Sequence, residues 1–337
     1  MSSTAAEINT AETIAFVDRV RERIAQVVVG QDVVVERLLV ALFTSGHLLL
    51  EGVPGLAKTL LVNALARSLC LDFKRIQFTV DLLPSDILGS EVLDQSSGTF
   101  RTRQGPIFTN LLLADEINRA APKVQGALLE AMQERKVTLG KETFSLPVPF
   151  LVIATQNPIE QAGTFELPEA QLDRFMLCHR LSYPTPAEEK LILERNLKLG
   201  VRKHEGGAVA KTEFDLVRDE PVGGPEELVA AMEAVQLVHV GEAFVDHVVE
   251  LVGRTRVHPS LEVGCSPRAG IALTRAARAR ALIHGRDYVV PDDLYALAED
   301  VVLHRLRLGY AALADGQTER DVLASILEEM GSRVEPG

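Results

Sequence analysis

Tryptophan is absent from this 337-residue sequence, and cysteine is rare. The three cysteines, Cys70, Cys178 and Cys265, are scattered and form no CxxC pair, which argues against a disulfide framework and a thiolate zinc site. None of the eight histidines stands in a metal-ligand spacing. We therefore expect neither a small disulfide-bonded protein nor a zinc-dependent one.

Long apolar runs are also missing. The nearest approach to the ~20 residues of a membrane span, Val33 to Phe43, is interrupted by Glu36 and Arg37. Residues 1–12 lack the basic start and apolar core of a signal peptide. A net charge of −12 argues against a surface that coats nucleic acid, although a local basic channel is compatible with it. We therefore expect a soluble protein.

The most informative stretch is GVPGLAKT, residues 52–59. It follows a short apolar run at residues 47–51 and precedes residues 60–69, where leucines recur at helical spacing. A glycine-bearing loop between a strand and a helix that opens on Lys-Thr is the context of a phosphate-binding P-loop. Its backbone N–H groups and the helix N-terminus attract phosphate. The predicted nucleotide contacts are Gly52, Val53, Pro54, Gly55, Leu56, Ala57, Lys58, Thr59 and Leu60.

Two side chains of this loop have specific roles in the prediction. Lys58 reaches the β- and γ-phosphates of ATP, and the hydroxyl of Thr59 completes a Mg²⁺ shell. Ala57 departs from the usual pattern, which has glycine before the lysine. Because alanine tolerates fewer backbone conformations, the loop must here take dihedral angles that an L-residue can hold.

Composition and patterning indicate an α/β fold. The chain is 47% hydrophobic and 24% charged, as in globular proteins, and its length suggests two or three domains. Strands that are apolar throughout alternate with amphipathic helices, which predicts a parallel sheet covered on both faces. The expected strands are residues 47–51, 74–80, 110–114, 150–155 and 177–181. Hairpins are expected near residues 89–103 and 137–146, the second with Gly140-Lys141 as a type II′ turn.

The character of the chain changes at Tyr183-Pro184-Thr185-Pro186. From there the pattern is helical, with helices expected at residues 191–199, 225–238, 242–256, 267–283 and 291–306. We therefore predict an α/β domain over residues 1–184 and a smaller all-α domain over residues 185–337.

Polar residues end two more of the apolar strands. Asp115 and Glu116 close LLLADE, and Asn157 follows ATQ. Because the carboxyl ends of parallel strands meet at one edge, we expect these residues beside the P-loop. There Asp115 would hold Mg²⁺ and Glu116 would polarise the attacking water, while Asn157 would orient that water or touch the γ-phosphate. The alternatives are a solvated strand end for the acidic pair and an ordinary turn before Pro158 for Asn157.

Arginines supply the remaining candidates. Arg174 precedes the last expected strand, and Arg268 begins a helix of the second domain. A P-loop hydrolase needs extra positive charge against its transition state, which a neighbouring subunit can supply. The alternative for Arg174 is a surface ion pair. Arg275, Arg278 and Arg280 continue the helix of Arg268, and a solvated helix face is the favoured interpretation of these three.

The motifs together resemble the MoxR-type AAA+ ATPases. Those that carry the resemblance are Val28-Val29-Gly30-Gln31, GVPGLAKT (52–59), LLLADEINRA (111–120), ATQNP (154–158), LPEAQLDRF (167–175) and SPRA (266–269). The resemblance spans about residues 12 to 330 and includes the P-loop alanine. It implies an AAA+ core followed by a helical lid, usually in a ring of six subunits with ATP between protomers.

The resemblance also implies individual roles. Val29, Gly30 and Gln31 look like part of the adenine pocket, and Asp115 and Glu116 like the second acidic motif. Asn157 is similar to the first sensor, Arg174 to the finger that acts on the neighbour, and Arg268 to the second sensor, in its own protomer or in the next. The two hairpins look like the inserts of the helix-2-insert group, which includes magnesium-chelatase I subunits and replicative helicases.

Members of this family are thought to be chaperone-like motors that act on proteins, often for cofactor or metal insertion and often with a von Willebrand A domain partner. No such domain precedes Gly337, so that partner is expected on a separate polypeptide. The predicted ATP site and the scattered cysteines together suggest a reducing, cytoplasmic setting without disulfides. The leading hypothesis is an ATP-driven motor acting on a protein client.

Two other classes remain open at this stage. A DNA-translocating or chelatase-type motor would use the hairpins as pore loops, but the charge beside their apolar residues is only modestly basic. A small-molecule P-loop kinase would need an acceptor site and no arginine from a neighbour. The Asp-Glu pair favours water as the nucleophile, which ranks the kinase last.

Overall fold

A five-stranded parallel sheet lies at the centre of the computed structural model, which describes residues 10–53, 55–96, 98–158, 163–204, 206–217 and 220–331. The strand order is β2-β5-β8-β1-β9, so the strand before the P-loop lies between two others. The strands are β1 (Leu48–Glu51), β2 (Phe73–Gln77), β5 (Leu111–Asp115), β8 (Leu151–Gln156) and β9 (Leu177–Arg180). The predicted fold class is confirmed.

Side chains of the inner strands alternate between two buried layers, since successive residues of a strand face opposite sides. Leu111 and Leu113 of β5 join the core that contains α1 (Thr10–Ala25), α2 (Asp32–Phe43) and α3 (Lys58–Ser68). Leu112 and Ala114 join a second core, formed with α4 (Pro84–Leu88) and α5 (Pro122–Glu134). Burial on both faces explains why these strands are apolar throughout.

Two antiparallel hairpins interrupt the α/β layer where they were expected. The first pairs β3 (Gly89–Asp94) with β4 (Thr99–Gln104), and the second pairs β6 (Lys136–Leu139) with β7 (Glu142–Ser145). Gly140 has φ +59° at the first loop position of the second hairpin, as a type II′ turn requires.

The C-terminal part is largely helical. After α6 (Glu169–Leu172), the helices are α7 (Pro186–Leu197), α8 (Pro225–Leu237), α9 (Glu242–Val257), α10 (Pro267–Ile283), α11 (Pro291–Val302), α12 (Tyr310–Ala314) and α13 (Glu319–Gly331). None of the described helices is both long and apolar enough to cross a membrane. The boundary at residue 184 stays a prediction, because one buried core joins α1 and α2 to α8, α10 and α11.

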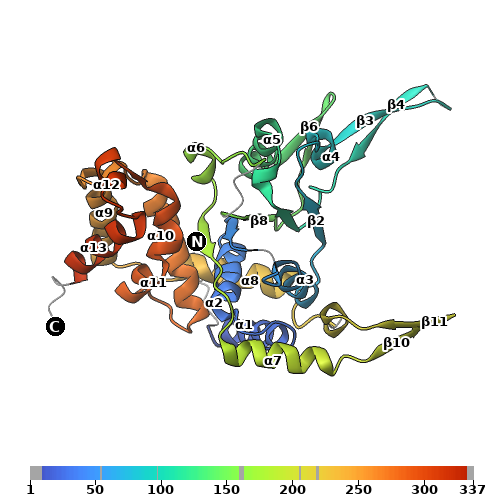
Figure 1. The fold of residues 1–337 in the computed structure, drawn as a ribbon, viewed down its shortest axis with the longest axis horizontal. Coiled ribbons are helices and arrows are strands. Elements are labelled where there is room, and N and C mark those ends of the chain that lie inside the picture. Colours follow the sequence, from blue (N-terminus) through green and yellow to red (C-terminus); the bar gives the residue numbers. More distant parts are fainter. Residues whose placement is uncertain are drawn as a thin grey trace, which may run out of the picture.

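Strands also occur in this part, which the helical pattern did not predict. β10 (Val201–His204) pairs with β11 (Gly207–Ala210), and β12 (Leu261–Val263) pairs with β13 (Arg307–Leu308). The expectation of a purely α-helical second domain was wrong at these positions. The β10–β11 hairpin projects from the same side of the molecule as β3–β4 (Figure 1), and β11 is exposed along its whole length.

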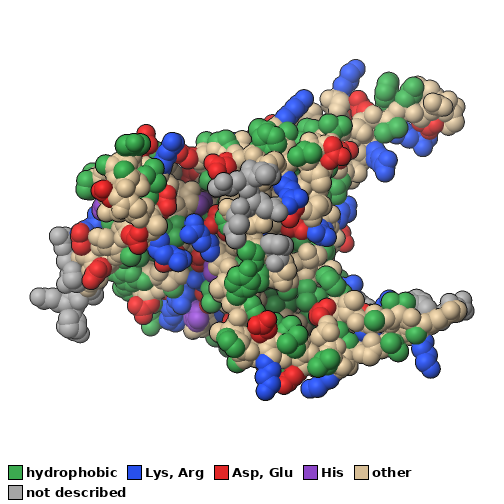
Figure 2. Space-filling view, viewed as in Figure 1, with side chains coloured by type: hydrophobic (Ala, Val, Ile, Leu, Met, Phe, Trp, Pro, Cys, Tyr) green, Lys and Arg blue, Asp and Glu red, His purple; other side chains and the backbone are tan. Residues whose placement is uncertain are grey.

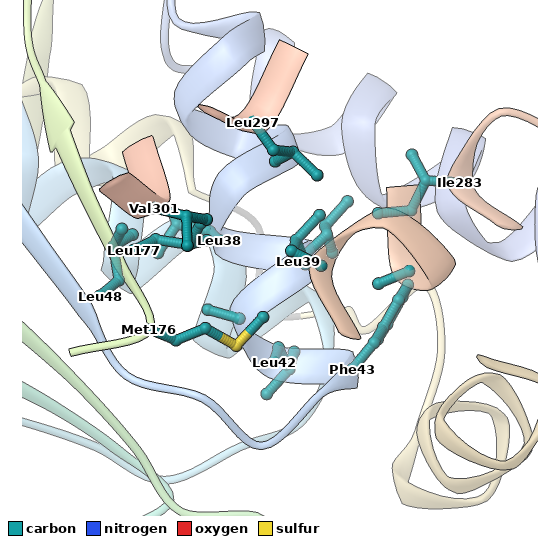
Figure 3. Packing of buried hydrophobic residues seen from close by; sticks show 14 of the residues in the cluster. Leu38, Leu39, Leu42, Phe43, Leu48, Met176, Leu177, Ile283, Leu297 and Val301 are labelled. Carbon is teal, nitrogen blue, oxygen red and sulfur yellow. The ribbon is translucent and has the colours of Figure 1, made fainter. Parts of the chain in front are cut away.

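Helix α2 lies between the sheet and the lid helices. Ten of its twelve residues are buried. Figure 3 shows Leu38 and Leu42 near Leu48 and Met176, beneath the lid residues Leu297 and Val301. A helix buried on nearly all sides lies in the interior of a protein, and this one joins the two parts of the chain.

Buried charges cross the same junction. Arg37 of α2 forms ion pairs with Glu36 and with Asp300 of α11. Arg280 of α10 pairs with Glu36 at 3.3 Å and with Asp293 at 2.6 Å. Burial raises the pKa of Glu36, but Arg37 and the hydrogen bond with His284 outweigh it and lower that pKa. The expected solvated face was therefore wrong for Arg280, whose side chain is 18% exposed.

His47, directly before β1, generates a prediction about stability and pH. Its Nδ1 accepts a hydrogen bond from the Val152 N–H at 3.0 Å, and its Nε2 lies 3.3 Å from the Met132 carbonyl oxygen. Burial lowers the pKa of His47 to about 4 from 6.5. Below pH 6.5 the unfolded chain binds a proton here that the folded protein does not. Stability is therefore lost as the pH falls, by about 2 kcal/mol between pH 7 and pH 5 from this residue.

Urea unfolding of the wild type and His47→Gln at pH 7 and pH 5 measures this contribution. We expect the variant to be less stable at pH 7 but to lose about 2 kcal/mol less on acidification. His239→Gln, at an exposed histidine, is the control. Equal losses in the wild type and His47→Gln would show that His47 does not carry the effect.

Candidate active site

One cavity of about 640 Å³ opens at the carboxyl ends of the central strands, where ligands bind in open α/β sheets. Its volume lies in the range of sites for small molecules and cofactors. The residues that line it are Val27, Val28, Val29, Gln31, Gly52, Gly55, Leu56, Ala57, Lys58, Thr59, Leu60, Arg75, Gln77, Asp115, Glu116, Thr155, Gln156, Asn157, Pro184, Ile192, Glu213 and Phe214.

The cavity brings together most of the predicted nucleotide contacts. Among the described residues with that assignment, Gly30 and Val53 do not line it, and Pro54 lies outside the described residues. Gly30, between the lining residues Val29 and Gln31, packs against Glu188, because a Cβ built there would lie 2.5 Å from the carboxyl carbon of that residue. Any side chain at Gly30 would displace Glu188, which caps α7 through Thr185.

The P-loop is closed by its lysine. Nζ of Lys58 donates to the Gly52 carbonyl oxygen at 2.8 Å, and α3 begins at Lys58 with its N-terminus at the cavity. Burial lowers the pKa of Lys58, while the nearby charges of Asp115 and Glu116 oppose the shift. Gly52 has no room for a side chain, since a Cβ there would lie 2.9 Å from Cβ of Leu181. The loop therefore presents backbone N–H groups and one ammonium to a ligand.

Ala57 takes the left-handed conformation, with φ +51° and ψ +22°. An L-residue can hold these angles at a cost of about 1–2 kcal/mol. The departure from glycine is therefore tolerated but strained. Strain of this kind clusters at functional sites.

The two acids at the carboxyl end of β5 are held differently. Asp115 accepts hydrogen bonds from Oγ1 of Thr155 at 2.6 Å and from the guanidinium of Arg75 at 2.6 Å. Glu116 has φ +57°, and its backbone N–H donates to Oγ1 of Thr155 at 2.9 Å. Oε2 of Glu116 accepts from Nε2 of Gln77 at 2.7 Å and pairs with Arg119 at 3.0 Å. Thr155 therefore ties the end of β8 to both acids.

Thr155, Arg75 and Gln77 were missed by the sequence analysis. A weak signal existed for two of them, because residues two apart on a strand share a face. Arg75 and Gln77 are such a polar pair at the carboxyl end of β2, where the register places Gln77 opposite Asp115. Thr155 was assigned only to a strand, and its hydroxyl gave no separate signal.

Part of the cavity wall is apolar. It is formed by Val27, Val28 and Val29, by Ile192 of α7 and by Phe214 of the short 3₁₀ helix η2 (Glu213–Leu216). Such a wall suits a purine base. Neither Ile192 nor Phe214 was predicted to line the site. Both are apolar, both lie far from the P-loop in the sequence, and neither belongs to a local motif that indicates nucleotide binding.

Asn157 is buried and lines two cavities. Together with Gln156 it separates the main cavity from a polar one of about 490 Å³. Asn157 directly follows β8 and lines the same cavity as Glu116, and its role in orienting water stays a prediction.

Arg174 and Arg268 lie elsewhere. Both line a separate cavity of about 240 Å³, whose described lining has no residue in common with the main cavity. Nη1 of Arg174 donates to the Leu129 carbonyl oxygen at 2.8 Å, and Nε of Arg174 is buried without a hydrogen-bond partner in the described part of the chain. Arg268, exposed at 61%, lies 3.5 Å from Oδ2 of Asp173. The structure thus brings these arginines together, away from their own P-loop.

The residues present fit a magnesium–nucleotide complex. Thr59 and Asp115 offer a hydroxyl and a carboxylate, the oxygen ligands that Mg²⁺ prefers. The described residues hold no group of three or more His, Cys, Asp or Glu able to bind a metal by themselves. Mg²⁺ is usually held by one or two protein groups together with substrate phosphates.

The fold and the site define a P-loop ATPase of the AAA class. Residues 47–177 match the ATPase family associated with various cellular activities (AAA), and residues 253–326 match the AAA lid domain.

Whole-chain similarity identifies the branch. The chain is 45% identical over 333 residues to Chaperone MoxR1 of Mycobacterium tuberculosis, covering 96% of this chain and 82% of that protein. Protein MoxR of Methylorubrum extorquens is 33% identical over 305 residues, with 86% and 87% covered. A crystal structure of a protein from Cytophaga hutchinsonii, assigned as an ATPase, matches with a TM-score of 0.83 and 40% identity over 94% of this chain and 96% of that one. The chain therefore belongs to the MoxR family of AAA+ ATPases.

The apolar wall generates a prediction about nucleotide affinity. Phe214→Ala removes most of the apolar contact on one side of the base, so we expect about tenfold weaker binding of a fluorescent ATP analogue, corresponding to ~1.4 kcal/mol. Leu197→Ala is the control, because Leu197 is 85% exposed at the end of α7 and lies outside the lining. If Phe214→Ala and Leu197→Ala bind the ATP analogue with equal affinity, the base does not contact Phe214.

Proposed function

We propose that this chain is the subunit of an ATP-driven motor that remodels a protein client, assembled as a homo-hexameric ring with nucleotide bound between protomers. The supporting observation is the separation of Arg174 and Arg268 from the cavity of their own P-loop. A hydrolase needs positive charge against the transition state. In a head-to-tail ring, the cavity of these arginines is free to face the nucleotide of the next subunit.

In this mechanism, Glu116 polarises the attacking water and Asn157 orients it. Lys58 contacts the β- and γ-phosphates, and Thr59 and Asp115 hold Mg²⁺, which supplies charge neutralisation at the phosphates. Arg174 acts on the neighbour's nucleotide as an arginine finger, and Arg268 acts beside it as the second sensor, also in trans.

Exposed apolar side chains favour a protein client. Phe100 is 68% exposed and Val92 47% exposed on the β3–β4 hairpin. Figure 2 shows hydrophobic and basic side chains together on both projecting hairpins. The client work we propose is maturation or metal and cofactor insertion in the cytoplasm, with a von Willebrand A domain protein as a separate partner.

A mixing experiment tests the shared site. Glu116→Gln loses hydrolysis in its own cavity but keeps Arg174, whereas Arg174→Ala keeps its cavity but cannot assist a neighbour. Each variant alone should turn over ATP at least 100-fold more slowly than the wild type. Because a mixed ring places an intact Arg174 beside an intact Glu116, we expect mixing to restore a substantial fraction of wild-type turnover.

The control is Arg101→Gln, at an exposed hairpin arginine that pairs with Asp94 and lies outside both cavities. This variant should hydrolyse ATP at the wild-type rate alone. Mixed with Glu116→Gln, it should raise ATP turnover no more than the same amount of wild-type protein does. Two silent variants that stay silent when mixed, although they co-assemble in sedimentation, would show that each site is complete within one subunit.

A further inference from the structure

Arg75 occupies a position in the site that the proposed mechanism does not use. It lies on β2, two residues before Gln77, which is directly opposite Asp115 on β5. Its Nη2 and Nε donate to the same oxygen, Oδ2 of Asp115, at 2.6 and 3.1 Å, and Nη2 also donates to Oε1 of Gln77 at 2.8 Å. The guanidinium is therefore fixed by two side chains although it is 46% exposed.

The Arg75–Asp115 ion pair reduces the negative charge of the cavity. The charged side chains in its described lining are Lys58, Arg75, Asp115, Glu116 and Glu213. Lys58 already donates to the Gly52 carbonyl oxygen. Without Arg75, the described lining would hold one ammonium and three carboxylates, and of these only Glu116 would keep an arginine partner, Arg119. Like charges a few ångströms apart repel strongly when they are partly buried.

The ion pair also competes with a cation. Oδ1 of Asp115 accepts from Thr155 and Oδ2 accepts from Arg75, so both oxygens have donors. The Thr155 hydroxyl is neutral and can share an oxygen that binds a metal. The guanidinium carries a full positive charge, so it and a divalent cation disfavour each other at one carboxylate.

We propose that Arg75 is a positioning residue that neutralises Asp115 while the site holds nucleotide without its metal, and that it releases the carboxylate when the divalent cation enters. This inference rests on the proposed function for the assignment of the cation to Asp115. Arg75 thereby lets the cavity accept metal-free nucleotide and weakens the hold on the cation in return.

Binding of the fluorescent non-hydrolysable analogue mant-AMP-PNP, with EDTA and with Mg²⁺, provides a readout other than activity. With EDTA we expect Arg75→Gln to weaken binding about tenfold, because Asp115 then repels the phosphates unshielded. With Mg²⁺ the loss should be less than about threefold, since the cation takes over the carboxylate. Arg75→Lys should bind like the wild type within about threefold in EDTA, because the ammonium keeps the charge while losing the fork of donors.

A double-mutant cycle identifies the route of the effect. In an Asp115→Asn background, Arg75→Gln should change binding in EDTA by less than about twofold, because no carboxylate remains to be neutralised. An undiminished tenfold loss in that background would show that Arg75 contacts the nucleotide directly, and would overturn the proposal. No loss from Arg75→Gln in EDTA would overturn it as well.

The matched control is Arg101→Gln, which removes an arginine from another surface ion pair, with Asp94 at 3.0 Å. It should leave binding unchanged in both buffers. The outcome is separable from that of the mixing experiment, because the cycle needs only one subunit's cavity. Failed complementation with an intact Arg75–Asp115 coupling contradicts the shared site alone. Successful complementation without that coupling contradicts the role of Arg75 alone.

Discussion

The burial of α2 between the sheet and the lid helices is the packing on which the rest of the structure depends. Leu38 and Leu42 contact the sheet side, while the charged pair Glu36 and Arg37 engages α10 and α11. Buried ion pairs of this kind are costly to desolvate unless every partner is present. The lid helices are consequently positioned by α2 itself, and through it by β1, the strand that leads into the P-loop.

The same arrangement explains how one cavity collects residues from distant parts of the chain. Parallel pairing sends the ends of β1, β5 and β8 to one edge, so the loop after β1, the acids after β5 and Asn157 after β8 converge. Helix α7 and η2 then close the apolar side. The nucleotide cavity is thus assembled from strand ends at its polar side and from the connection to the lid at its apolar side.

The sequence was sufficient for features that depend on local pattern. The order of strands and helices, both early hairpins and the residues at the strand ends followed from periodicity, turn chemistry and the P-loop. Contacts across the sheet did not, because Arg75 meets Asp115 only through a register that no local pattern specifies. The β10–β11 hairpin was missed for another reason: it is short, and because β11 is exposed along its length, burial imposes no hydrophobic pattern on it.

The two cavities also divide the arginines by role. Arg75 lines the main cavity together with Lys58, whereas Arg174 and Arg268 line the second cavity together with His47 and Met132. Asp173 receives both Arg268 and Arg305, so it anchors Arg268 beside Arg174. The cations in the described lining of the main cavity are therefore Lys58 and Arg75, and neither Arg174 nor Arg268 is among them.

Left-handed backbone at Ala57 and Glu116 narrows the range of sequences open to this site. Side chains branched at Cβ are the least compatible with such dihedral angles, so Val, Ile and Thr are disfavoured at both positions whatever their chemistry. Substitution of Ala57 by glycine causes no backbone strain, because glycine adopts the left-handed conformation readily. Substitution of glycine by alanine at this position introduces strain that the surrounding fold must be stable enough to offset. At Glu116, exchange for glutamine keeps both the shape and the unbranched Cβ. Backbone geometry therefore restricts which residues can replace Ala57 and Glu116, independently of any requirement of catalysis.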